Sequence, residues 1–68
     1  MKENFGDFIK RVRVEKGLSI DDLAEASGYS AVQIRNFEKN KFKPQVFKLK
    51  QLADALGCDY EELYKKVN

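Results

Sequence analysis

The 68-residue sequence has no histidine, no tryptophan, one cysteine and one proline. The lone Cys58 cannot form a disulfide within the chain. Without histidine, neither a Cys/His zinc finger nor a Ser/His or Cys/His nucleophile can be built. Apolar runs are only two or three residues long, so the sequence predicts no signal peptide and no membrane span. We therefore expect a cytoplasmic protein that is not an enzyme and has no metal site, no cofactor and no evident small-molecule site.

Positive and negative charges nearly balance over the whole chain, but they are unevenly distributed along the sequence. The formal net charge is +2, yet residues 35–52 contain six basic and one acidic side chain, a local charge of +5. The segments before and after it carry −1 and −2. Because a concentrated positive patch releases counterions from a phosphate backbone, this asymmetry indicates a polyanionic partner.

Apolar residues recur with the helical period along the chain, and no segment alternates as a buried strand would. The pattern predicts helices at about 4–16, 19–27, 30–39, 45–56 and 59–67. The connections are short, so consecutive helices must pack against one another. We expect a single domain over residues 1–68, an all-α, compact five-helix bundle.

Four pairs of residues predict where helices start, because each places a capping side chain three residues before an acid or amide. Gly17, Gly28 and Gly57 follow periodic segments, where a left-handed residue ends a helix, and Asn40 stands in a similar place. On the fourth helix we expect a core face made of Val46, Leu49, Ala53 and Leu56. The four capping pairs are Asn4 with Asp7, Ser19 with Asp22, Ser30 with Gln33, and Asp59 with Glu62.

The second and third predicted helices are separated only by "GYS", so they should cross steeply. Such a crossing needs a small residue where the backbones approach, Ala24, and a residue that turns without strain, Gly28. Leu23, Ile34 and Phe37 then point into the core. This spacing is typical of a helix-turn-helix, in which the second helix presents its free face to a DNA major groove.

From Phe5 to Tyr64 the sequence resembles the phage-repressor-like helix-turn-helix domains, the lambda repressor and Cro type also called the XRE family. The motifs that carry the resemblance are "RVEKGLS", "LAEASGYS", "IRNFEKNKFKP" and "LADALG". The resemblance implies a five-helix domain whose third helix reads bases. It also implies phosphate contacts from neighbouring helix starts and from the following loop, usually in a homodimer on a two-fold operator.

The sequence departs from the family pattern at the start of two helices and at the end of one. Ile20 replaces a glutamine that often contacts a phosphate, so we expect that contact to be missing. Asn40 replaces the usual glycine, which should matter little because asparagine tolerates the left-handed conformation. Relatives often have polar residues at the positions of Ala31 and Val32. In this sequence, these two side chains could make only apolar contacts with bases, for example with a thymine methyl.

Three polar residues of the third helix could reach base edges. Arginine pairs with guanine, and asparagine or glutamine pairs with adenine, so Gln33, Arg35 and Asn36 are the candidates. Gln33 is equally explained as the amide of the capping pair that begins at Ser30, and Arg35 could contact phosphate instead. Ser30, Lys39, Lys41 and Lys43 are candidate phosphate contacts, although a lysine-rich loop is most often simply solvated.

Arg13 and Glu38 each lie on an apolar stripe, so burial would require them to meet, and the family has this pair as an internal salt bridge. Cys58 is best explained as a small buried hydrophobic residue. Phe42 and Phe47 have no obvious place in the core. Either both rings fold back over its edge, or they form an exposed patch suited to a weak homodimer on a two-fold operator.

The predicted function is a sequence-specific, double-stranded-DNA-binding transcriptional regulator, more often a repressor in this family. The alternative is a protein-interaction module on the same fold, such as an antirepressor or antitoxin. The +5 segment favours DNA, whereas apolar residues on the face of the third helix keep the alternative open.

Overall fold

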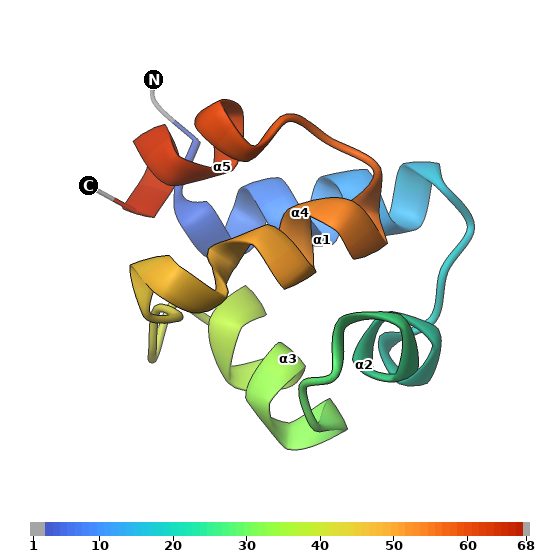
Figure 1. Cartoon of the computed structure of the whole chain (residues 1–68). Coiled ribbons are helices and arrows are strands. Elements are labelled where there is room, and N and C mark those ends of the chain that lie inside the picture. The colour runs from blue at the N-terminus through green and yellow to red at the C-terminus, as the bar shows by residue number, and fades with distance from the viewer. Residues whose placement is uncertain (1–2, 68) are drawn as a thin grey trace.

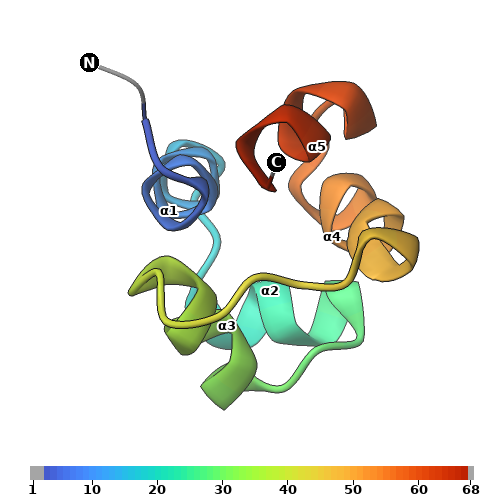
Figure 2. The ribbon, with the colours of Figure 1, turned by 90° about the vertical axis from the view of Figure 1, so that its left-hand side faces the viewer.

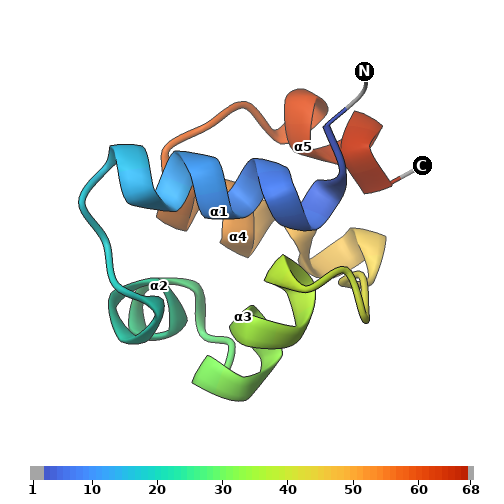
Figure 3. The same cartoon turned by 180° about the vertical axis from the view of Figure 1, so that it is seen from behind.

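The computed structural model describes residues 3–67 and contains five α-helices in that range, with no strand among them. The helices pack around one core, with α2 and α3 on one side and α1, α4 and α5 on the other (Figures 1, 2 and 3). This confirms the all-α prediction. The bounds are α1 Phe5–Glu15, α2 Ile20–Ser27, α3 Ala31–Glu38, α4 Leu49–Leu56 and α5 Tyr60–Val67, with a 3-10 turn, η1, at Val46–Lys48.

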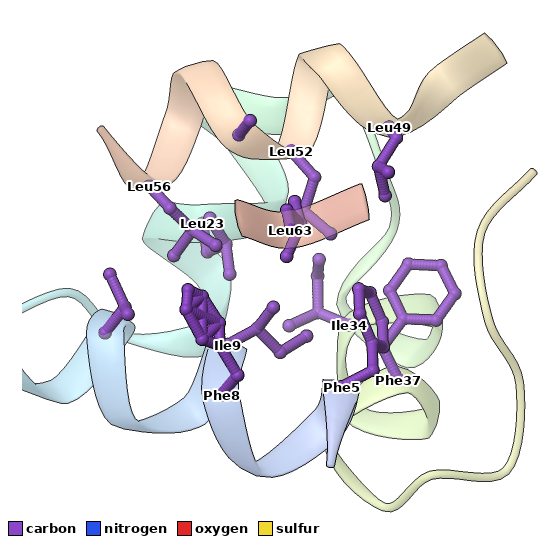
Figure 4. Packing of buried hydrophobic residues seen from close by; sticks show 12 residues of the cluster. Phe5, Phe8, Ile9, Leu23, Ile34, Phe37, Leu49, Leu52, Leu56 and Leu63 are labelled. Carbon is purple, nitrogen blue, oxygen red and sulfur yellow. The ribbon is translucent and has the colours of Figure 1, made fainter. Parts of the chain in front are cut away.

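All five helices contribute to the core (Figure 4). Ile9, Leu23 and Ile34 are fully buried, and Phe5 meets Phe37 edge to face with ring centroids 6.0 Å apart. The predicted inward positions on α2 and α3 are therefore confirmed. The remaining core residues are Phe8, Val12, Leu49, Leu52, Ala53, Leu56 and Leu63.

The predicted core face of the fourth helix is wrong at its first residue. Val46 is 43% exposed and belongs to η1, whereas the regular helix begins at Leu49. A 3-10 turn has three residues per turn, so Val46 falls out of register with the stripe that follows. Leu52 is buried instead, and the stripe from Leu49 has the spacing of an ordinary amphipathic helix.

The helix-turn-helix is built from local hydrogen bonds. Ser19 and Ser30 each accept a bond from the amide three residues on, and the side chains of Asp22 and Gln33 accept from the amides of Ser19 and Ser30 in return. Gly28 ends α2 with φ 82° in the left-handed region. These two capping boxes and the turn are as predicted, and the box at Asp59 stays a prediction.

The predicted capping pair at Asn4 is wrong. The side chain of Asn4 makes no capping hydrogen bond to α1. The buried amide of Gly6, the second residue of this helix, instead donates to Oδ1 of Asn40 at 2.9 Å. The start of α1 is therefore capped by a residue 34 positions away in the chain.

No helix within residues 3–67 has both the length and the apolar character needed to cross a membrane.

Candidate nucleic-acid interface

Helix α3 has one face in the core and the other in solvent. Ile34 and Phe37 are buried, while Val32, Gln33 and Arg35 are exposed. The other candidate base contacts, Ala31 and Asn36, are half-buried. The predicted base-reading residues are therefore all at least partly accessible to solvent.

At the start of α3 the capping box occupies the polar groups on one side. The amide of Ser30 donates to Oε1 of Gln33 at 2.9 Å, and Oγ of Ser30 accepts from the Gln33 amide at 3.1 Å. Gln33 thus serves the cap, and its Nε2 is the end of the side chain that this box leaves free. Val32 is 61% exposed. The surface of the first turn of α3 therefore includes the apolar side chain of Val32 and the free Nε2 end of Gln33.

A shallow pocket of about 330 Å³ adjoins the middle of α3. Its walls include Gln33 and Asn36, together with Tyr29, Gln45 and Lys48, which the sequence analysis did not select. The other lining residues are Phe37, Phe42, Lys43 and Pro44. The pocket extends the accessible surface of α3 towards η1.

Tyr29 links the turn before α3 to η1. Its hydroxyl donates to the carbonyl of Lys48 at 3.1 Å, and its ring meets Phe37 edge to face with centroids 5.1 Å apart. Burial raises the pKa of the Tyr29 hydroxyl. The sequence feature that could have drawn attention to Tyr29 is its position as an aromatic residue between the glycine and the serine of the turn "GYS".

The candidate phosphate contacts do not share one environment. Lys39 and Lys41 are exposed at the end of α3, and Ser30 is held in its capping box. Nζ of Lys43 donates to the carbonyl of Val67 at 3.4 Å, which places this ammonium against the C-terminal end of α5. A cation is favourable there because the carbonyl end of a helix is partly negative. Lys39 and Lys41 are therefore better placed for phosphate than Lys43.

Arg13 and Glu38 form the predicted ion pair. Nε of Arg13 donates to Glu38 at 2.6 Å and Nη2 donates to its other oxygen at 3.2 Å, while Nη1 donates to the carbonyl of Leu18 at 2.7 Å. The side chains are 11% and 7% exposed. This two-pronged contact links α1 to the end of α3 and to the loop before α2.

The packing of Ile20 and Cys58 explains why apolar residues stand at both positions. Both residues are half-buried and lie against the core cluster. Burial raises the pKa of the Cys58 thiol, which disfavours the reactive thiolate. Within the described part of the chain no three histidine, cysteine or acidic side chains come together in a way that could hold a metal ion.

Phe42 and Phe47 do not fold back over the core. They are 61% and 76% exposed, so the interpretation that they cover its edge is wrong. Phe42 lines the pocket beside α3, whereas Phe47 has the Lys48 ammonium 5.9 Å from its ring centroid. Phe42 therefore adds apolar surface beside α3, and Phe47 adds apolar surface on η1.

Known proteins are similar to this chain in sequence and in fold. Two curated relatives are similar to the chain. It is 35% identical over 63 residues to the uncharacterized HTH-type transcriptional regulator y4dJ of Sinorhizobium fredii, which covers 93% of this chain and 82% of that protein. It is 38% identical over 65 residues to the HTH-type transcriptional repressor RghR of Bacillus subtilis, covering 94% of this chain but only 48% of RghR.

Two solved structures that contain DNA also match. The P22 c2 repressor in complex with a synthetic operator is 26% identical, with 96% of this chain and 98% of that chain covered and a TM-score of 0.87. The biofilm master regulator SinR in complex with DNA is 30% identical, with 88% and 97% covered and a TM-score of 0.80. A family model described as helix-turn-helix matches residues 9–63, and the chain belongs to this helix-turn-helix family.

Proposed function

We propose that this protein represses transcription by binding a specific DNA sequence, with α3 in the major groove. The broader function, that of a DNA-binding transcriptional regulator, follows from the family. The observation that supports the finer proposal is the two-sided character of α3. Ile34 and Phe37 hold one face in the core, and the other face carries the side chains suited to base edges, next to two exposed lysines.

The accessible side chains of α3 suit particular groups on base edges. Arg35 can donate two bonds to guanine, and Asn36 can pair with adenine. Val32 can only contact an apolar group, and the C5-methyl of thymine is the apolar group that base pairs present in the major groove. Gln33 keeps a free Nε2, so we assign it a donor role towards an acceptor such as guanine O6.

Phosphate binding is the first part of this proposal to test. The affinity for a random duplex should fall steeply as salt rises, because lysines at the interface displace counterions from the DNA. Lys41→Ala should weaken binding to all sequences alike and lower the salt slope by about 1. Lys10→Ala, which removes an exposed lysine on α1, is the matched control and should leave the slope unchanged. A parent slope near zero would favour the protein-interaction module instead.

We further propose a weak homodimer on a two-fold operator, with the exposed rings of Phe42 and Phe47 at the contact. Recognition helices paired in this way enter major grooves about one helical turn, 10 to 10.5 base pairs, apart. Phe47→Ser should then reduce affinity for a full operator more than for a half-site. Val14→Ser, at another exposed apolar residue, is the control. Equal losses on both DNAs would exclude this dimer.

We infer that the protein acts by binding and has no chemistry of its own, and that residues 1–68 form one domain. The shared core supports the single domain, since all five helices contribute to it.

A further inference from the structure

We propose that Asn40 is a positioning residue for the DNA interface, because its side chain fixes the end of α3 against the start of α1. The inference rests on the proposed function, since it assigns Asn40 a role in orienting the base and phosphate contacts. From the sequence, asparagine in place of glycine at position 40 is expected to matter little. The structure assigns it two separate tasks, one for its backbone and one for its side chain.

The backbone of Asn40 closes α3. It is the one residue other than glycine with positive φ among those described, at 60°. Its amide donates to the Phe37 carbonyl at 3.0 Å, and the amide of Lys41 donates to the Asn36 carbonyl at 2.9 Å. These two bonds make the Schellman motif, in which a left-handed residue turns the chain away from a finished helix.

The side chain of Asn40 caps a different helix. Its Oδ1 accepts from the amide of Gly6 at 2.9 Å. Gly6 is buried and its amide is one of the first four of α1, which have no carbonyl partner within their own helix. Removing the Asn40 acceptor would leave a buried donor without this partner, which is costly.

The start of α1 and the end of α3 are in close backbone contact at Gly6. A Cβ added at Gly6 would lie 2.3 Å from the Phe37 carbonyl oxygen and 2.8 Å from Oδ1 of Asn40. The start of α1 therefore lies directly against the backbone at the end of α3. Any displacement of the start of α1 that follows loss of the bond between Gly6 and Asn40 should therefore also displace the end of α3.

The residues beside Asn40 are those assigned to DNA. Asn36, a proposed base contact, and Lys41, a proposed phosphate contact, are joined by the same hydrogen bond that closes α3. Anchoring Asn40 to α1 holds both at a fixed angle to the rest of the domain. Loss of the anchor should therefore reduce the preference for the correct sequence more than it reduces general attraction to DNA.

Asn40→Gly separates the two tasks. Glycine adopts the left-handed conformation without strain, so the backbone task is kept and only the side-chain acceptor is lost. Asn40→Asp restores an acceptor oxygen, and a carboxylate is favourable at a helix start. If conformation alone mattered, the glycine variant would match the parent. If the acceptor matters, the glycine variant loses function and the aspartate variant recovers it.

The contact is first tested without DNA, by amide hydrogen exchange of Gly6 under native conditions. We expect Asn40→Gly to accelerate exchange at Gly6 by about threefold to tenfold, the ratio that corresponds to losing one ordinary hydrogen bond. Asn40→Asp should restore slow exchange. Unchanged exchange at Gly6 in the glycine variant would show that the side-chain contact does not hold the start of α1, and would overturn the proposal.

The positioning role is tested by the ratio of affinities for a selected site and for a random duplex. We expect Asn40→Gly to lower this ratio by about threefold to tenfold, with a melting temperature that falls by only about 3 to 10 °C so that the variant stays folded, and Asn40→Asp to restore the ratio. The ratio is used because an added negative charge weakens binding to both duplexes alike. A parent-like ratio in Asn40→Gly would overturn this inference alone. A parent that prefers no sequence would overturn the proposed function and this role with it, while Gly6 exchange still reports the contact.

Discussion

The two ends of α3 are held in different ways. The N-terminal end is fixed by a capping box between Ser30 and Gln33, residues three positions apart. The C-terminal end is fixed from α1, through the bond of Asn40 to Gly6 and the ion pair of Glu38 with Arg13. One end therefore depends on its own sequence and the other on distant parts of the chain.

This difference fits the proposed task of the helix. The first turn must project from the domain to enter a groove, so it cannot be covered by other segments and must satisfy its own amides. The last turn sets the angle of the helix, so it gains from anchoring to the core. Contacts at the last turn should therefore contribute more to stability than those at the first.

Glu38→Ala is expected to have the largest effect, because it leaves the guanidinium of Arg13 nearly buried without its carboxylate. The loss should be about 3 to 5 kcal/mol of the free energy of unfolding. Urea denaturation measures it. Since small domains are only marginally stable, we expect part of the variant to be unfolded before urea is added. Glu38→Gln keeps a side-chain oxygen that can accept from Arg13, and it should lose less.

The control for this substitution is a solvent-exposed ion pair on α1, the helix that carries Arg13. Arg11 donates to Glu3 at 2.8 Å and also contacts Glu15, but its side chain is 49% exposed. Solvent screens such a pair, so Arg11→Ala should leave the free energy of unfolding almost unchanged. If Glu38→Ala and Arg11→Ala had equally small effects, the anchored end of α3 would contribute no more than the surface does.

Ser30→Ala, at the N-terminal end of α3, should have an intermediate effect on the free energy of unfolding. It removes the acceptor for the Gln33 amide and should cost about 1 kcal/mol, the usual value of a serine cap. The same denaturation experiment measures it, and Ser30→Asp, which keeps a capping oxygen, serves as the control. A loss as large as that of Glu38→Ala would contradict the difference between the two ends.

The smallest expected effect is on the pH dependence of stability. It is seen by comparing the capping box at the start of α3 with the one at the start of α2. The amide and hydroxyl of Ser19 hold the pKa of the Asp22 carboxyl below its ordinary value, whereas Gln33 in the matching box does not titrate. A lowered pKa in the folded state stabilises the fold above the unfolded pKa, about 3.9, and this stabilisation is lost as pH falls through the folded pKa.

Asp22→Asn should therefore reduce the loss of stability between pH 5 and pH 2, and Gln33→Glu should introduce a new loss in that range. Urea denaturation at several pH values gives both comparisons. An unchanged pH dependence in Asp22→Asn would show that the α2 box contributes equally in both charge states.

The parts of the structure that were predictable are those with a local signal. The boxes at Ser19 and Ser30 follow from residues three apart, and the pair of Arg13 with Glu38 follows from charges on apolar stripes. The cap of α1 by Asn40 joins positions 34 residues apart and has no periodic or motif signal. The exposure of Val46 depends on a 3-10 turn whose pitch the apolar pattern does not reveal.

The candidate site was predictable to the same extent. Helical period alone places Val32, Arg35 and Asn36 on the face away from Ile34 and Phe37. It does not show that Lys43 bonds the end of α5 or that Tyr29 bonds Lys48, because these contacts are made by flexible or long side chains across the fold. In the candidate site the exposed face of α3 was thus predictable, and the partners of Lys43 and Tyr29 were not.

Base reading by α3 is tested most directly by the affinity of the parent and of Asn36→Ala for a duplex selected from random DNA, measured beside a random duplex at one salt concentration. We expect a loss of about 1 to 3 kcal/mol on the selected duplex, because a bidentate base contact is removed, and no loss on the random one. An equal loss on both duplexes, or none on either, would contradict base reading by the exposed face of α3.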